Sequence, residues 1–289
     1  VPSPTSTPTV TPSITVTPTT TPSITVTPTP TPTKQLPGLN LVINYRSDTN
    51  YNNLQKQQFD LAAEKLSRVV KDDWTLTLEV GYVFGGMLAN AGPTNSTSAR
   101  ELPSTGVMNF NPDHLNGSGN NLDLTILDGT HTAMYYVIIH EVCHVLGIGT
   151  FWNRNWNDPT VQANRDVLYN GNTGQLLPSV VQDYTPLNPV YKGPAAVAAY
   201  NQAYGLNVDS LPIEDGAQGG SSGSHLEEGA GGYGNSIRII DGFAHPVLDN
   251  ELMTPVFDAG VENPMSAITL GMLEDIGWTV DYAHAQSFP

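Results

Sequence analysis

The side chains best suited to chemistry lie at residues 140–144, which read H-E-V-C-H. On a helix, His140 and His144 lie one turn apart on the same face, so their nitrogens can bind one metal ion at about 2.0–2.1 Å. Glu141 is rotated by about 100° from His140 and can reach a water beside the ion without coordinating it. Zinc would acidify that water and polarise a carbonyl, while the carboxylate would take up and return the proton. The motif therefore predicts zinc-dependent hydrolysis.

The surroundings of the motif favour a catalytic site over a structural one. We predict a helix over 131–146, in which the stretch M-Y-Y-V-I-I-H-E-V-C-H-V-L-G is largely apolar and ends at Gly147. A buried helix tolerates His and Glu only if their polar atoms are satisfied. The alternatives are a hydrogen-bonded pair in the core and a zinc site without catalysis, and catalysis is the preferred interpretation.

A catalytic zinc needs a third protein ligand. His131 is too far along the same helix, and His114 and His284 fall near a predicted loop and tail. His225 lies in the polar loop G-S-S-G-S-H-L-E-E-G, where packing gives no reason to bury an imidazole. His245 lies in F-A-H-P-V. The residues alone favour His225 and leave His245 as the alternative.

These residues match a known family. H-E-V-C-H-V-L-G resembles the metal-binding helix of the metzincin peptidases. The short metzincin pattern would place the third His at position 150, where this chain has Thr150. The leishmanolysin-like branch has a long insert before that His, as 147–225 would be here. Four further stretches are similar to that branch: H-L-E at 225–227, E-L-M-T-P at 251–255, L-A-N-A-G-P-T at 88–94, and residues 267–282.

The resemblance implies a role for each matching residue. His140, His144 and His225 would hold Zn²⁺, and Glu141 would be the base. Met253 would form a hydrophobic floor under the ion without coordinating it. An edge strand would pair with an extended substrate backbone, and it would consist of Met87, Leu88, Ala89 and Asn90.

The elements that must position these residues follow from the hydrophobic pattern. We predict strands at 41–45, 74–84 and 106–110, a short apolar piece at 87–91, and helices at 52–70, 131–146 and 194–204. A last helix should begin with Asn263 as cap and Pro264 in its first turn, and should end at Gly277. Residues 148–263 are rich in Gly, Asn, Pro and Asp and predict loops, and Trp278 to Tyr282 should pack back on the body.

With the resemblance, these elements imply an α+β fold of the metzincin-like zincin type at 38–289. The upper lobe, 38–150, would hold a mixed twisted sheet and the active-site helix. The lower lobe, 151–289, would be rich in loops and would hold the C-terminal helix.

The first 37 residues have a different composition. Residues 1–33 are almost entirely Thr, Pro, Ser, Val and Ile, and T-P-S-I-T-V-T-P occurs at both 11–18 and 21–28. Closely spaced prolines remove backbone donors, and few large apolar groups offset the entropy of ordering. We predict a disordered stalk or linker at 1–37, either O-glycosylated or plain.

The net charge of -16 argues against nucleic acid and anionic membrane surfaces as partners. No apolar run is long enough for membrane insertion, and the single Cys143, predicted to be a buried apolar group, permits no intramolecular disulfide. Ca²⁺ is a second candidate ion, although solvated acidic loops are the favoured interpretation. The acidic residues concerned are Asp123, Asp128, Glu214, Asp215, Asp241 and Asp249.

Together these observations predict a secreted, extracellular or cell-surface zinc metalloendopeptidase that acts as a monomer on proteins or peptides. The alternative from another class is a stalked surface adhesin or binding module with a structural zinc. A third interpretation keeps the zinc chemistry but directs it at other amides, such as those of cell walls.

Overall fold

The computed structural model describes most of the chain after the Thr/Pro-rich segment. The described residues are 38–96, 102–115, 122, 127–152, 166–177, 187–216, 221–229, 237–240, 242–257 and 260–289. Residues Gln35–Pro289 group into one unit by their contacts. The stalk at 1–37 lies outside the described residues, and both the stalk and the division into two lobes stay predictions.

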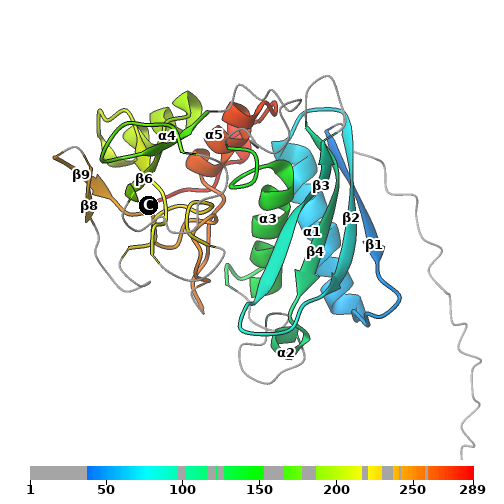
Figure 1. The fold of residues 1–289 in the computed structure, drawn as a ribbon. Coiled ribbons are helices and arrows are strands. Elements are labelled where there is room, and N and C mark those ends of the chain that lie inside the picture. Colours follow the sequence, from blue (N-terminus) through cyan, green and yellow to red (C-terminus); the bar gives the residue numbers. More distant parts are fainter. Residues whose placement is uncertain are drawn as a thin grey trace, which may run out of the picture. The chain divides into compact units, whose positions relative to one another are not determined.

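A four-stranded mixed sheet forms the first half of this unit (Figure 1). Its strands, in spatial order, are β1 (Leu39–Tyr45), β2 (Trp74–Tyr82), β4 (Pro103–Phe110) and β3 (Ala89–Ser96). The first three are parallel to one another, and β3 runs antiparallel to β4 at the edge. Alternate residues of β2 are fully buried because one face of the sheet is covered. The mixed sheet confirms the α+β class.

Two helices cover that face of the sheet, α1 (Asn53–Val69) and α3 (Ala133–Leu146) (Figure 1). A capping box starts α1, in which the Asn52 side chain accepts from the Gln55 N–H at 2.9 Å and Gln55 Oε1 accepts from the Asn52 N–H at 2.8 Å. The hydroxyl of Thr132 caps α3, and Gly147 ends it at φ 121°. Almost every residue of α3 is buried between the sheet, α1 and the second half, which explains its continuous apolar sequence.

The second half contains two helices that the sequence predicted and several short elements that it did not. The helices α4 (Pro194–Tyr204) and α5 (Ala267–Ile276) pack together, and the bounds predicted for α4 are confirmed. A four-residue helix, α2, also went unpredicted in the first half. The unpredicted elements are α2 (Pro112–Leu115), β5 (Leu168–Asn170), β6 (Pro189–Tyr191), β7 (Leu211–Pro212), β8 (Ile237–Ile240), β9 (Phe243–Pro246) and a 3-10 turn at Tyr282–His284. None exceeds four residues, so no hydrophobic period could reveal them.

The predicted start of the last helix was wrong. The N-cap of α5 is Ser266, whose hydroxyl accepts from the Ile268 N–H at 3.0 Å, so the helix does not begin at Asn263 and Pro264. The preceding residues are extended because they pair with other segments. The Pro264 carbonyl accepts from the Leu252 N–H at 3.1 Å, and the Met265 carbonyl accepts from the Gln286 N–H at 2.9 Å.

The predicted edge strand also begins later than expected. Ala89 and Asn90 lie in β3, whereas Met87 and Leu88 precede it. Asn111 holds both of these residues after the end of β4. Its backbone N–H donates to the Leu88 carbonyl at 2.9 Å, and its side-chain amide donates to the Met87 carbonyl at 3.2 Å.

The end of the chain returns to the first half, as predicted. Val280 forms a bridge with Val70, and the indole N–H of Trp278 donates to the Leu146 carbonyl at 2.8 Å. The buried carboxylate of Asp72 accepts from the Thr279 backbone N–H at 2.6 Å. These bonds fasten the C-terminal segment to the ends of α1 and α3. No helix in the described part of the chain is long and apolar enough to cross a bilayer.

Replacing Asp72 with Ala should lower the free energy of unfolding by about 1–3 kcal/mol, because the Thr279 N–H loses a charged acceptor in a partly buried place. The neighbouring Asp73 is exposed, so Asp73→Ala is the matched control and should change stability by less than about 0.5 kcal/mol. Urea unfolding of both variants measures the difference. Equal stabilities would mean that the C-terminal return does not depend on this carboxylate.

Candidate metal centre

Three histidine rings converge on one point. His140 and His144 come from α3, and His225 comes from the loop that follows β7. Their Nε2 atoms form a triangle with edges of 3.1 Å (His140 to His144), 3.0 Å (His144 to His225) and 3.3 Å (His140 to His225). A tetrahedral zinc with bonds of about 2.0–2.1 Å holds its ligand atoms about 3.3 Å apart. The spacing therefore fits three ligands of one such ion.

Backbone carbonyls fix the orientation of each ring. The Nδ1 atoms of His140, His144 and His225 face the carbonyl oxygens of Leu252 at 2.6 Å, Ile148 at 3.0 Å and Ser221 at 3.0 Å. A carbonyl can only accept, so Nδ1 must carry the proton in each ring. The three Nε2 lone pairs then all point toward the centre of the triangle, as a metal site requires.

The environment keeps the three rings neutral. Burial lowers the pKa of His140 to about 3, with a smaller contribution from His144. Burial also lowers the pKa of His144, and burial together with the two other rings takes that of His225 well below its ordinary value. Three neutral lone pairs at this distance repel one another unless a cation lies between them. The donor set therefore fits a divalent metal that accepts imidazole nitrogen.

Glu141 follows His140 on α3 and is buried. Its Oε2 has no hydrogen-bond partner among the described residues. Burial raises the pKa of its carboxyl group to about 8. A buried carboxylate oxygen without a protein partner is unusual and needs a ligand or a water.

The segment around Met253 contacts His140 and Leu226, the residue that follows His225. The Leu252 carbonyl accepts from His140, and the Met253 carbonyl accepts from the N–H of Leu226 at 3.0 Å. Leu226 directly follows His225, and Met253 itself is fully buried. The segment thus joins α3 to the loop that carries His225.

The strand before His225 brings that residue to the helix. Ile213, directly after β7, forms an antiparallel bridge with Leu226, and the N–H of Glu214 donates to the His225 carbonyl at 3.0 Å. On the other side, Gly149 lies so close to Ser224 that a Cβ at this position would overlap the Ser224 carbonyl oxygen. Only glycine permits this approach, since φ of Gly149 is also +73°.

The structure keeps the other candidate ligands away from the triangle. His245 lies in β9 opposite Arg238 and stacks on Tyr200 at 6.3 Å between ring centroids. His131 binds Asp128 at 2.6 Å. At the position of the third ligand in the short pattern, the Thr150 hydroxyl donates to the His144 carbonyl at 2.9 Å. Among the described residues, the histidine group that could hold a metal consists of His140, His144 and His225.

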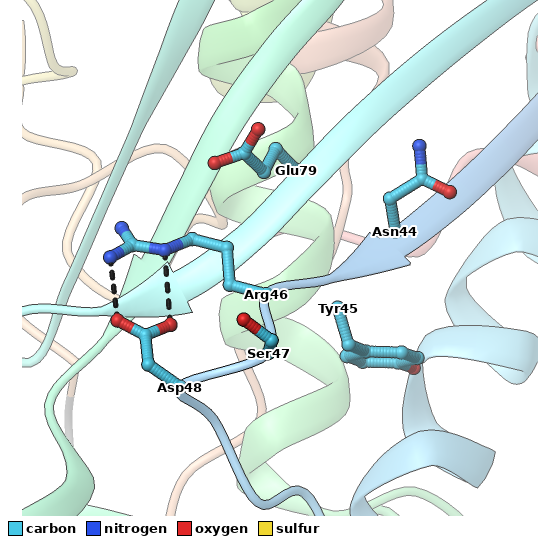
Figure 2. Close-up of a pocket in the computed structure, with 6 residues that line it drawn as sticks. All are labelled: Asn44, Tyr45, Arg46, Ser47, Asp48 and Glu79. Atoms are coloured by element: carbon cyan, nitrogen blue, oxygen red, sulfur yellow. Dashed lines mark hydrogen bonds and ion pairs between the residues drawn. The ribbon is translucent and has the colours of Figure 1, made fainter.

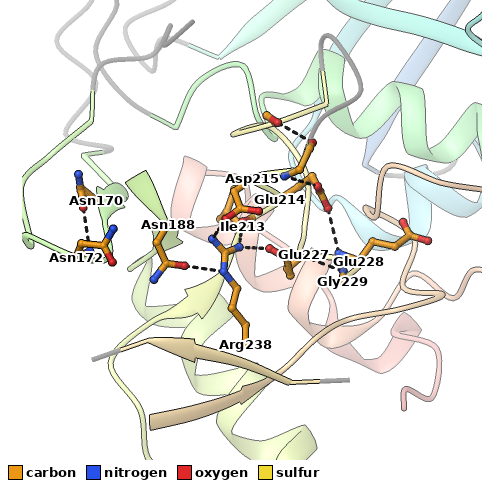
Figure 3. Close-up of polar contacts among 12 residues, drawn as sticks. Asn170, Asn172, Asn188, Ile213, Glu214, Asp215, Glu227, Glu228, Gly229 and Arg238 are labelled. Carbon is orange, nitrogen blue, oxygen red and sulfur yellow. Dashed lines mark hydrogen bonds and ion pairs between the residues drawn. The ribbon is translucent and has the colours of Figure 1, made fainter. Parts of the chain in front are cut away.

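A second group of acidic residues, Glu214, Asp215 and Glu227, lies around the partly buried guanidinium of Arg238 (Figure 3). Arg238 donates to Asp215 at 2.6 Å and forms an ion pair with Glu227, and it also reaches Asn188 at 2.6 Å. The guanidinium supplies the positive charge that a Ca²⁺ ion would bring, so the structure does not support calcium at Glu214 and Asp215. Asp123 and Asp241 lie outside the described residues, and Asp128 already binds His131 and Tyr136.

The solvent-open hollow at the end of β1 is not part of this centre (Figure 2). It has a volume of about 420 Å³ and is lined by residues 44–48 together with Glu79. Its one cation, Arg46, is already held by two bonds to Asp48, at 3.2 and 2.7 Å. None of the three converging histidines lines it.

The edge strand β3 lies against α3, the helix that carries two of the histidines (Figure 1). Its partner on one side is β4, and no other described strand pairs with it. Asn90 accepts from the Asn109 side chain at 2.9 Å, and the Met87 side chain is exposed. Among the described strands, none pairs with the outer edge of β3, which lies beside the helix that carries His140 and His144.

Comparison with known proteins identifies one family. A family model described as leishmanolysin matches residues 86–289. The matched stretch contains the three histidines, Glu141 and Met253. A search of curated proteins finds no match to the chain.

Replacing Gly149 with Ala should raise the dissociation constant for zinc about 10–100-fold, because the new Cβ would displace Ser224 and with it His225. Gly174 is a matched control, since its φ is +69° and an added Cβ would meet open space. Both variants bear similar backbone strain, so only displacement of the loop separates them. Competition with a chromophoric chelator measures both affinities, and equal values for the two would contradict the expected displacement.

The choice of third ligand can be tested by replacing His225 and His245 separately with Asn. His225→Asn should weaken zinc binding more than about 100-fold, because loss of a ligand exceeds the loss of a ligand's partner. His245→Asn should keep the affinity of the parent protein. Both are measured by chelator competition on protein shown to be folded by circular dichroism. The opposite ranking would assign the site to His245.

Proposed function

The chain belongs to the leishmanolysin family, and from this membership and its histidine triangle we propose that it is a zinc-dependent endopeptidase. The observation that carries the proposal is the set of three Nε2 atoms 3.0–3.3 Å apart, each on a ring oriented by a backbone carbonyl. A bound zinc ion would supply an acidified water and would polarise the carbonyl of the scissile peptide.

The residues of the chain divide the remaining work. His140, His144 and His225 hold the metal through Nε2. Glu141 takes a proton from the attacking water and returns it to the leaving amine, and burial, which raises the pKa of its carboxyl group, makes it a stronger base. Met253 provides an apolar surface next to the ligands without binding the metal.

The edge strand beside α3 is proposed to bind the substrate backbone. Ala89 and Asn90 belong to β3, whose outer edge pairs with no described strand. An extended peptide can add to such an edge through backbone hydrogen bonds, with little demand on its sequence. Met87 and Leu88, directly before the strand, would contact side chains of the substrate.

The stalked adhesin with a structural zinc is less well supported. Structural zinc sites are closed by four protein ligands, whereas catalytic sites keep one position open. The described residues supply three ligands here, and an unpartnered carboxylate oxygen of Glu141 lies on the same helix. An open position and a nearby base serve hydrolysis better than structural support.

We also propose that the protein acts outside the cell, either secreted or at the cell surface, as a monomer. The Thr/Pro-rich composition of residues 1–33 is typical of extracellular stalks. Proteins or peptides are the proposed substrates, in keeping with the family. The same chemistry on cell-wall amides is the second candidate, and panels of substrates distinguish the two.

Glu141→Gln should reduce cleavage of an unfolded protein by about 10²–10⁴-fold, because the variant lacks the base but keeps the shape of the side chain. Its zinc content should remain one ion per chain, since Glu141 is not a ligand. Gel electrophoresis of the digest and metal analysis of the same samples give both values. Active Glu141→Gln protein would refute the role of Glu141. An inert parent protein with full zinc would instead favour the adhesin or a substrate of another kind.

A further inference from the structure

Glu251, a fully buried carboxylate, lies two residues before Met253 and does not belong to the histidine group. Its Oε1 accepts from the Ser266 N–H at 3.2 Å, the Ser266 hydroxyl at 2.5 Å and the Thr269 hydroxyl at 2.7 Å. Its Oε2 accepts from the Met253 N–H at 2.7 Å. Four donors are thus directed at one carboxylate that has no contact with solvent.

Burial is the larger effect and raises the pKa of Glu251, and its four donors stabilise the ionised form against that effect. Two of the four donors are backbone N–H groups, which cannot accept a proton in return. Ser266 is the N-cap of α5, where the helix dipole stabilises a negative charge.

One peptide group connects Glu251 to the metal centre. The N–H of Met253 and the carbonyl of Leu252 belong to the same planar peptide. Glu251 Oε2 binds the N–H end at 2.7 Å, and His140 Nδ1 donates to the carbonyl end at 2.6 Å. A negative charge at the N–H end polarises the peptide and makes its carbonyl a stronger acceptor. The order of contacts is therefore carboxylate, peptide and imidazole.

We propose that Glu251 is a positioning residue that orients His140 and increases its basicity through the Leu252–Met253 peptide. Many metal-binding histidines donate directly to a carboxylate. In this protein the Leu252–Met253 peptide lies between Glu251 and His140, so the carboxylate acts on the imidazole through that peptide instead of through a direct hydrogen bond. The inference rests on the proposed metal function of His140.

A purely structural role for Glu251 would give a different pattern. In that case the carboxylate would only fasten the segment around Met253 to the start of α5. Loss of any of its four donors would then lower the free energy of unfolding, and no such loss would change the affinity for the metal. Thr269→Val distinguishes the two roles. It removes a donor to Oε1 and leaves the bond from the Met253 N–H to Oε2 in place.

The test compares Glu251→Ala, Glu251→Gln and Thr269→Val with the parent protein. Each is loaded with Co²⁺, whose visible absorption reports ligand geometry, and zinc affinity is measured separately by chelator competition. Glu251→Ala should raise the zinc dissociation constant about 10–100-fold and shift the cobalt band. Glu251→Gln keeps the shape but removes the charge, so its rise should be smaller. Thr269→Val should lower the melting temperature and leave the affinity and the cobalt band unchanged.

Unchanged affinity and cobalt spectrum in folded Glu251→Ala would overturn the inference. If that variant does not fold, Glu251→Gln decides, and values equal to those of the parent protein would overturn it. Neither measurement depends on turnover. A parent protein that binds metal but cleaves nothing would refute the proposed function and leave this inference standing. If the parent protein cleaves its substrate while the Glu251 variants keep the zinc affinity and cobalt spectrum of the parent, the proposed function stands and this inference is overturned.

Discussion

The convergence of three neutral imidazole lone pairs is the constraint on which the rest of the structure depends. The three lone pairs repel one another without a cation, so each ring must be fixed by a hydrogen bond at its Nδ1. The three carbonyls that do this belong to Ile148, Ser221 and Leu252, in segments distant along the chain. The residues directly after α3, the loop after β7 and the segment before α5 must therefore meet at one place.

The sequence predicted those parts of the site and fold that have a short period. His140, Glu141 and His144 are separated by fixed steps on one helix, so their shared face follows from helical geometry. The long strands and helices of the first half are visible because apolar residues recur along them, as at Phe59, Ala62 and Leu66 in α1. The choice of His225 over His245 was a preference from the residues, and only the resemblance made it specific.

The remaining features depend on pairings between distant segments. The start of α5 was misplaced because the Pro264 carbonyl accepts from the Leu252 N–H and the Met265 carbonyl from the Gln286 N–H, and neither partner is local. The strand β7, directly before the bridge that positions His225, has only two residues and carries no period of its own. Arg238 lies in no motif, and Glu251 is the single charge that opens the E-L-M-T-P stretch, so the part each plays becomes visible only through the groups that surround it. A useful signal was available for Glu251, since a carboxylate in the apolar stretch around E-L-M-T-P needs donors if it is buried.

The separation of the ligands along the chain has a thermodynamic consequence. His144 and His225 are 81 residues apart, and an ion bound to both closes a loop of that length. Bringing the ends of so long a loop together costs conformational entropy on folding, and metal binding that occurs only in the folded chain would offset this cost, where many secreted proteins use a disulfide. The chain has only one cysteine and cannot form such a crosslink within itself. A bound metal would take its place, so that folding of the second half and acquisition of the metal become a single thermodynamic event.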